Sequence, residues 1–434
     1  MRIYVRKRIH LIAAMFFIAT IFFNACTWNE PDFSSESIPL DDSEYPYVGL
    51  PRLVIETENF AEILDREIEH PARLQIYAQS SPESDVKNLT IRGRGNSSFI
   101  MTKFGYKLEF EEKEELFGMP QNRDWDLVPN FRDKSFLRNY ITYQLASDLH
   151  APFSPKSHFI ELFLNRQYLG VFQFTEHIKV AKNRVNIEES DSSFLVEKTT
   201  GTTTGASELD DTNEISFDKD DVLFTTSQGY IFKIKSPKKA SEKSIELVQE
   251  HFNEFEKFIQ SKGFKNISLD SLNKWIDVDD FIRYYWIQEF SKNLDGAFRR
   301  SFYMTWKKGD VIKMGPVWDF DIGYGLSSTN KISPEKWYIK NYGWYKYLMK
   351  NKAYANRVKN YWSENRDSFE NVLTTIDSEA SKLSPELKNE HKRWPVLGED
   401  SYWPFIESYE NYEEAIDSLK TWVRKRLIWI DENL

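Results

Sequence analysis

Apolar and polar positions alternate in short runs of the first half of the chain, the pattern of half-buried strands. Leu53–Ile55 is a short β-rich run, and Tyr106–Phe110 alternates strictly. Phe159–Leu164 and Tyr168–Phe174 are rich in β-formers, and the polar pair Asn165-Arg166 separates them. We therefore predict strands in these runs and a hairpin with its turn at Asn165-Arg166.

Other segments repeat their apolar residues at helical spacing. Asp133 is expected to cap a helix that runs to Leu149, and Asp277 to cap one that runs to Ser291. Ser241–Lys262 has the strongest amphipathic pattern and is followed by Gly263, a typical helix end. Since the rest, from Ser333 onward, is mostly helical in pattern, we predict an α+β fold with a strand-rich N-terminal half, a helix-rich C-terminal half and two lobes.

The first 25 residues have the zones of an export signal. Basic residues begin the chain, the uncharged apolar run Leu11–Phe23 follows, and Cys26 comes three residues later. The run is too short to cross a bilayer but suits a signal peptide. The residues before Cys26 resemble the lipobox of bacterial lipoproteins, which implies cleavage before Cys26 and a lipid on its thiol. The alternatives are a plain secretory peptide, an uncleaved anchor and a buried apolar helix with an incidental cysteine.

We thus expect residues 1–25 to be a lipoprotein signal peptide and residues 26–48, which are acidic and rich in proline and serine, to be a solvated tether. Residues 49–434 form the folded domain, with a surface insertion at about 199–221. The location expected is the bacterial cell envelope, periplasmic or at the cell surface, with a lipid anchor as the membrane contact.

Composition narrows the possible functions. The chain has 57 Lys and Arg against 67 Asp and Glu, a net charge of −10, so we expect no nucleic-acid partner. Its single cysteine excludes a disulfide framework within the chain and a CxxC zinc site. Aromatic residues make up 15% of the chain, enough to fill a large core or to line a binding surface.

A glycine-rich segment at Arg92–Ser98 lies between strand-like runs. Its glycines allow a close backbone approach, and Arg92, Arg94, Asn96 and Ser97 carry groups that bind phosphate oxygens. An ordinary glycine turn is the alternative.

The strand after this segment carries a lysine. Lys107 has the position that protein kinases give to their phosphate-contacting lysine, and Lys103 competes for that role. Glu176 is a candidate ion-pair partner for such a lysine. A solvated strand lysine and an unrelated glutamate are the simpler interpretations.

The most informative group of residues lies between Lys292 and Asp321. Asp295 follows a helix end, a predicted hairpin (Ser301–Trp306 and Val311–Trp318) comes next, and Asp319 and Asp321 close the segment. Protein kinases order a catalytic aspartate and a metal-binding aspartate in the same way. If residues 319–321 are extended, both carboxylates project to one face, where a cation or an arginine must balance them.

Taken together, these motifs resemble the CotH kinase family, named for spore coat protein H. The resemblance spans about residues 50–326 and continues less distinctly to the C-terminus. It rests on Arg92–Ser98, Tyr106–Phe110, Leu116–Pro120, Phe136–Asn139, Glu161–Gly170, Thr175–Ile178, Lys292–Asp295, Phe298–Tyr303 and Gly315–Asp321. It implies a divergent protein-kinase-like fold and a kinase that uses ATP and Mg²⁺ to phosphorylate Ser or Thr of a protein.

The same resemblance implies the role of each site residue. Asp295 would be the catalytic carboxylate, Asp319 the main metal ligand, and Asp321 its assistant. Lys107 and the Arg92–Ser98 segment would contact the phosphates. The alternatives are a non-catalytic surface module, or pseudokinase, that recognises protein or glycan, and a glycosidase with two carboxylates, for which adjacent aspartates are a poor match.

Overall fold

The computed structural model describes most of the chain and divides it into the units Met1–Glu36 and Ser37–Leu434. The described residues are 36–95, 98–202, 221–326, 332–398 and 409–434. The described helices and strands all belong to the second unit. The predicted signal peptide, the lipobox and Cys26 lie outside the described residues. Among the described residues, no helix is long and apolar enough to span a bilayer.

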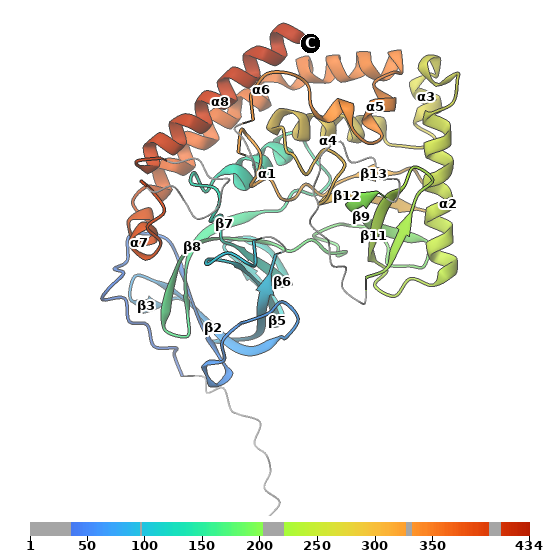
Figure 1. Cartoon of the computed structure of the whole chain (residues 1–434). Helices are drawn as coiled ribbons and strands as arrows, with labels where there is room; N and C mark the ends of the chain where they lie inside the picture. Colours follow the sequence, from blue (N-terminus) through green and yellow to red (C-terminus); the bar gives the residue numbers. More distant parts are fainter. Residues whose placement is uncertain (1–35, 96–97, 203–220, 327–331, 399–408) are drawn as a thin grey trace, which may run out of the picture. The chain divides into compact units, whose positions relative to one another are not determined.

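A closed β-barrel forms the first half of the unit (Figure 1). Its neighbours around the ring are β1 (Arg52–Thr57), β7 (Ser157–Leu164), β8 (Gln167–Glu176), β6 (Met119–Val128), β5 (Gly105–Leu116), β4 (Lys87–Arg94) and β2 (His70–Ala78). The ring closes because β1 pairs antiparallel with β2 and parallel with β7. The short β3 (Ser81–Pro82) forms a hairpin with β2. The sequence predicted β1, β5, β7, β8 and the hairpin turn at Asn165-Arg166, but neither β4, β6 nor the closure of the ring.

Alternation along the strands separates the interior of the barrel from its outer face. On β5, Tyr106, Leu108 and Phe110 belong to the buried apolar cluster inside the barrel. Lys107 and Glu109 alternate with them and face outward. The outer face of β4, β5 and β6 therefore carries the charged residues.

The predicted tether is shorter than residues 26–48. Ile38 is fully buried, and the ring of Tyr45 stacks on that of Tyr168 with centroids 4.2 Å apart. Asp42 pairs with Arg52 at 2.5 Å. Residues 37–48 thus pack on the barrel, because their few apolar side chains find partners there that the acidic composition does not reveal.

A second sheet lies beside the barrel and has β9 near its centre (Figure 1). Its order is β10 (Leu223–Thr225), β11 (Tyr230–Ser236), β9 (Ser193–Thr202), β12 (Phe302–Lys307) and β13 (Lys313–Met314). Of the predicted strand at Val311–Trp318, only the two residues of β13 pair with β12. The insertion predicted at about 199–221 starts too early, because β9 continues to Thr202; residues 203–220 lie outside the described part.

Helices make up most of the rest. They are α1 (Arg138–Asp148), α2 (Glu242–Ile259), α3 (Leu269–Leu272), α4 (Val278–Ser291), α5 (Tyr345–Leu348), α6 (Lys352–Leu383), α7 (Leu387–Arg393) and α8 (Tyr412–Asn433), with 3₁₀ turns at Glu58–Phe60, Phe264–Asn266 and Ile339–Asn341. The fold is therefore mixed α+β, with strands concentrated in the first half and helices in the second. This confirms the coarser part of the predicted fold class.

Local signals explain several helix ends. The Ser241 side chain accepts from Ser244 N–H at 3.2 Å, and that of Asp277 accepts from Asp280 N–H at 3.0 Å, as expected for N-caps. The helix predicted to start after Asp133 begins later, at Arg138. The Asp133 carboxylate accepts from Ser135 N–H and from Arg138 N–H, both at 2.9 Å, and so holds a loop ahead of the helix.

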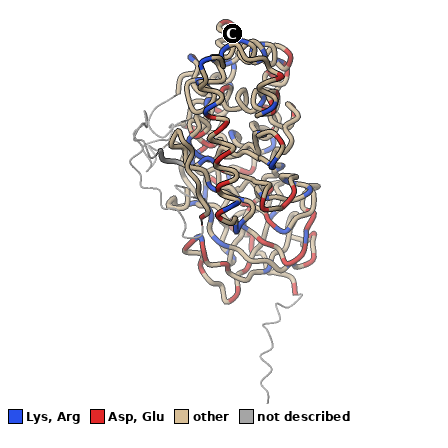
Figure 2. The backbone as a smooth tube through the Cα atoms, turned by 90° about the vertical axis from the view of Figure 1, so that its right-hand side faces the viewer, with Lys and Arg blue, Asp and Glu red and all other residues tan. Residues whose placement is uncertain are grey.

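Charged residues of both signs are interleaved along the chain (Figure 2). Arg357 of α6, for example, donates to Asp279 at 2.9 Å and to Glu364 at 2.8 Å. Such exposed pairs contribute little stability individually.

Gly170 marks where α7 presses on the barrel. Its φ is 96°, and a Cβ there would lie 2.1 Å from Glu390 Oε2 and 3.1 Å from Trp394 Nε1. Glu390 cannot move away easily, because it accepts from Lys103 Nζ and from Val171 N–H, each at 2.7 Å. We expect Gly170→Ala to lower the free energy of unfolding by about 1–3 kcal/mol, measured by denaturant titration.

Gly263→Ala is the matched control for this change. Gly263 has an ordinary φ of −86° and no atom within 4 Å of an added Cβ. Alanine there should be neutral or slightly stabilising. Equal effects of the two substitutions would contradict the close packing of α7 on β8.

Candidate active site

A cleft of about 340 Å³ lies between the outer face of the barrel and the second sheet. The barrel side contributes the end of β4 and the loop at residues 128–132, and the second sheet contributes β9 and β11. The loop after α4, with Asp295 and Arg300, and the segment after β13, with Trp318–Ile322, complete the cleft. The acidic residues lining it are Glu67, Glu197, Asp221, Asp295, Asp319 and Asp321, and the basic ones are Arg66, Arg92, Arg94, Arg132, Lys233, Lys235 and Arg300. The volume lies in the range of small-molecule sites.

The first acidic segment of the cleft follows α4. Lys292 ends that helix in a left-handed conformation with φ 46°, so the chain turns sharply and Asp295 comes to the cleft. Asp295 N–H donates to Asn293 Oδ1 at 3.2 Å. Arg300 Nε lies 3.6 Å from Asp295 Oδ1.

The second acidic segment, residues 319–321, is called the acidic loop below. Asp319 has φ 67°, an uncommon backbone conformation for a residue with a side chain. Its carbonyl accepts from Asn293 Nδ2, and its Oδ2 accepts from Ser301 Oγ, both at 3.1 Å. Since Asn293 contacts both acidic segments, it fixes their distance along the cleft.

The prediction of an extended strand at the acidic loop is wrong. Residues 315–320 form no strand, and the left-handed Asp319 breaks the simple alternation. Asp319 and Asp321 nevertheless both line the cleft. The backbone turn, and not the pleat of a strand, brings the two carboxylates there.

Burial and nearby negative charge disfavour the charged forms of Asp295 and Asp321. Burial raises the pKa of Asp295 to about 6; Arg300 opposes this increase and Asp319 adds to it. Burial, followed by the charge of Asp319, raises the pKa of Asp321 to about 7. A cation in the cleft would relieve this repulsion.

The residues present fit a magnesium ion that arrives with phosphates. Among the described residues, no three His, Cys, Asp or Glu side chains are grouped so as to hold a metal by themselves. Mg²⁺ commonly takes one or two protein carboxylates and completes its shell with phosphate oxygens and water. Asp319 and Asp321 would be its ligands, and the nearby arginines suit the phosphates.

One family model matches the chain, that of the CotH kinase protein, over residues 91–430. The matched region contains both acidic segments and most of the cleft. The chain belongs to the CotH kinase family. No curated protein matches the chain.

Relative to this family match, the barrel extends further toward the N-terminus. β1, β2 and β3 all precede residue 91. Arg66, in the loop between β1 and β2, still reaches the cleft. The CotH-matched region therefore needs preceding strands to complete both its barrel and its cleft wall.

Several residues of the predicted phosphate-binding segment line the cleft. Arg92, Arg94 and Ser98 do so, whereas Asn96 and Ser97 lie outside the described residues. The guanidinium of Arg94 lies 5.3 Å from the centre of the Trp318 ring, beside the acidic loop. Arg92 and Arg94 thus line the same cleft as Asp295, Asp319 and Asp321.

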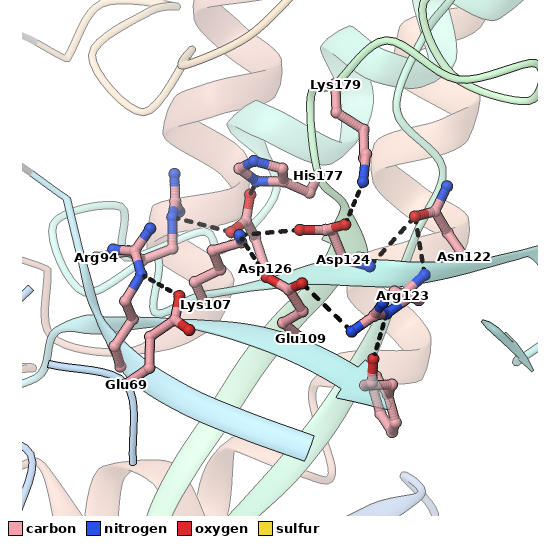
Figure 3. Close-up of polar contacts among 12 residues, drawn as sticks. Glu69, Arg94, Lys107, Glu109, Asn122, Arg123, Asp124, Asp126, His177 and Lys179 are labelled. Carbon is pink, nitrogen blue, oxygen red and sulfur yellow. Dashed lines mark hydrogen bonds and ion pairs between the residues drawn. The ribbon is translucent and has the colours of Figure 1, made fainter. Parts of the chain in front are cut away.

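The predicted phosphate-contacting lysine, Lys107, does not line the cleft. Its Nζ lies 2.9 Å from Asp124 Oδ1 and 3.4 Å from Glu109 on the outer face of the barrel (Figure 3). Asp124 also pairs with Lys179 at 2.5 Å. Lys103 is not a substitute, because it is buried against Glu390 and the Val171 carbonyl.

The predicted pairing of Glu176 with a phosphate-binding lysine is wrong. Glu176 pairs with Arg184 at 2.6 Å and accepts from Lys156 N–H at 2.9 Å. It lines a different cavity, between the β5–β6 turn and the segment that follows α1. Glu176 ends β8, and the loop that follows folds back to bring Arg184 against it. The sequence does not indicate this return of the loop.

A buried carboxylate supports Arg94 from the side away from the cleft. Asp126, on β6, has Oδ1 3.3 Å from Arg94 Nε and accepts from His177 Nδ1 at 2.8 Å (Figure 3). Burial alone would raise the pKa of Asp126, but interactions with Arg94 and His177 lower this pKa to about 2. The Asp126 carboxylate, which its basic neighbours keep in the charged form at neutral pH, therefore helps to fix the position of Arg94.

Five basic residues of the cleft were assigned to no site from the sequence: Arg66, Arg132, Lys233, Lys235 and Arg300. Lys233 and Lys235 are two residues apart on β11, so they share one face of that strand and line the cleft together. Nothing in the sequence indicated which cleft that face would line.

Proposed function

We propose that this protein transfers the γ-phosphoryl group of ATP to a Ser or Thr hydroxyl of a protein substrate. The main support is that two acidic segments distant in sequence, with Asp295 and Asp319, line one cleft together with Arg92 and Arg94. Phosphoryl transfer needs a carboxylate at the hydroxyl, carboxylates for a metal and cations for the phosphates. Membership in the CotH kinase family supports the same reaction class.

In this proposal the protein is a divergent two-lobed kinase-like molecule. The barrel is one lobe, and the second sheet with the helices is the other. The cleft between them would take ATP, as the cleft between kinase lobes does.

Each residue has a defined role in the proposal. Asp295 orients the substrate hydroxyl and accepts its proton; its burial favours this, because a base works best with a pKa near the working pH. Asp319, assisted by Asp321, holds Mg²⁺, and Arg94 and Arg92 hold phosphate oxygens. When bound, Mg²⁺ neutralises the charge of the phosphates.

Calorimetric titration of ATP with Mg²⁺ into the purified protein tests the proposal. We expect micromolar binding that requires Mg²⁺ and that disappears in Asp319→Asn. Absence of nucleotide binding in a protein shown to be folded would contradict the kinase function.

That outcome would favour the second candidate, a non-catalytic module that recognises protein or glycan. One observation supports it: neither Lys107 nor Lys103 lines the cleft, and carboxylates elsewhere hold both. Ligand binding by such a module should be indifferent to EDTA and to Asp319→Asn.

The proposal places the protein in the bacterial cell envelope with a lipid on Cys26. We expect Cys26→Ser to move most of the protein from the membrane fraction to the soluble fraction, because stable anchoring depends on the acyl chains. The measurement is fractionation after expression in a bacterial host. Ser35→Ala serves as the control, and an unchanged distribution of Cys26→Ser would contradict the lipid anchor.

A further inference from the structure

A buried chain of amide side chains connects the acidic loop to the barrel. Phe320 N–H donates to Asn139 Oδ1 at 2.7 Å, and Asn139 Nδ2 donates to Asn130 Oδ1 at 3.2 Å. Asn130 Nδ2 donates to Gln173 Oε1 at 3.0 Å, and Gln173 Nε2 donates to Ser157 Oγ at 2.9 Å. The three amide residues are at most 3% exposed. The path therefore runs from the acidic loop through α1 and the 128–136 loop to β8 and β7.

The direction of every bond in this chain is fixed. The backbone N–H of Phe320 can only donate, so Asn139 must present its oxygen there and its NH₂ group to Asn130. Asn130 Nδ2 also donates to the Phe136 carbonyl at 3.2 Å, and a carbonyl can only accept. Turning Asn139 or Asn130 over would set two acceptors or two donors against each other at both ends of that amide. Turning Gln173 over would do so at Asn130, whereas the Ser157 hydroxyl can donate or accept. Each member therefore holds its neighbours in one orientation.

The acidic loop needs such a restraint. Asp319 has a left-handed backbone, and Asp319 and Asp321 repel each other on either side of Phe320. Asn293, after α4, and Ser301, just before β12, hold Asp319. Asn139, on α1, supplies a further bond at the residue between the two carboxylates.

We propose that Asn139 is a positioning residue that holds the acidic loop in the form that binds a cation, and that Asn130 and Gln173 transmit this restraint from the barrel. The inference rests on the proposed function in one respect, the assignment of Asp319 and Asp321 as cation ligands. The restraint itself can be measured without nucleotide.

Amide hydrogen exchange of the full protein measures the restraint directly. We expect exchange at the Phe320 amide to rise roughly tenfold in Asn139→Ala, because its acceptor is gone, and about threefold in Gln173→Leu. Gln173→Leu keeps the test valid if Asn139→Ala does not fold, since it lies in the barrel and does not line the cleft. Gln144→Leu, at an exposed amide on the same helix as Asn139, is the matched control and should leave Phe320 unchanged.

Calorimetry then measures the consequence for cation binding. At fixed ATP, the Mg²⁺ concentration that gives half-maximal nucleotide binding should rise about tenfold in Asn139→Ala, while nucleotide affinity at saturating Mg²⁺ stays near that of the unsubstituted protein. A merely structural role would instead lower the folded fraction and leave the Mg²⁺ requirement of the folded protein unchanged.

The outcomes separate this inference from the proposed function. Unchanged Phe320 exchange in both Asn139→Ala and Gln173→Leu would overturn the inference, as would faster exchange with an unchanged Mg²⁺ requirement. If the unsubstituted protein binds no Mg²⁺–nucleotide but Phe320 exchange responds as expected, the proposed function is overturned and the restraint is supported.

Discussion

Replacing Asp295 by Asn should lower phosphoryl transfer by about 10²–10⁴-fold, the range that loss of a positioned base produces. The amide keeps the size of the carboxylate but cannot accept the proton of the substrate hydroxyl. Asp295 N–H would still donate to Asn293, so the turn after α4 should keep its shape. Binding of Mg²⁺–ATP should remain within a few-fold of normal, because Asp319 and Asp321 are untouched.

The measurement is initial-rate transfer from labelled ATP beside calorimetric binding. Asp417→Asn, at an exposed position on α8, is the control for loss of one negative charge and should leave both unchanged. If Asp295→Asn lost nucleotide binding together with transfer, Asp295 would belong to the metal site and not to the hydroxyl. If transfer persisted at the normal rate, another group would accept the proton.

Replacing Arg426 by Met should lower the free energy of unfolding by about 3–5 kcal/mol, the largest stability effect we expect from one side chain. Arg426, on α8, is fully buried and donates to Glu289 Oε1 at 2.6 Å and to Pro334 O at 2.7 Å. Glu289, on α4, is also fully buried. Without Arg426 the buried carboxylate would keep the backbone N–H donors of Tyr338 and Lys340 but lose its ion-pair partner, which is costly.

Denaturant unfolding measures this effect, with Arg424→Met as the control because Arg424 lies exposed two residues earlier on the same helix. Adding Glu289→Gln to Arg426→Met should recover part of the loss, since it removes the unpaired charge. If Arg426→Met lowered the free energy of unfolding by less than about 1 kcal/mol, water would reach Glu289 and the ion pair would not be excluded from solvent.

Much of the secondary structure was predictable because its signals are local. Ser241 caps α2 through its own hydroxyl, and the alternation of Tyr106, Leu108 and Phe110 sets the inner face of β5. The parallel pairing of β1 with β7 has no such signal. This pairing places Arg52 opposite Glu161, and the local sequence of neither strand indicates which strand it pairs with.

The candidate site likewise contains residues that the sequence predicted, and it lacks one that the sequence placed there. Asp295, Asp319, Asp321, Arg92 and Arg94 were predicted, and all line the cleft. Lys107 was expected in the same site, but strand register places it opposite Asp126 and next to Asp124, away from the cleft. Local sequence indicates which residues carry chemistry, whereas pairing between distant strands decides which of them share a cleft.

The way the barrel closes also sets an order of events during synthesis. β1 is made early, yet its parallel neighbour β7 ends at Leu164, so the ring cannot close until more than a hundred further residues have appeared. Until then β1 has β2 on one side and an open edge on the other, the kind of edge that recruits foreign strands. Contacts of such long sequence separation form slowly. We therefore expect the newly made chain to depend on being kept apart from its copies until β7 and β8 arrive.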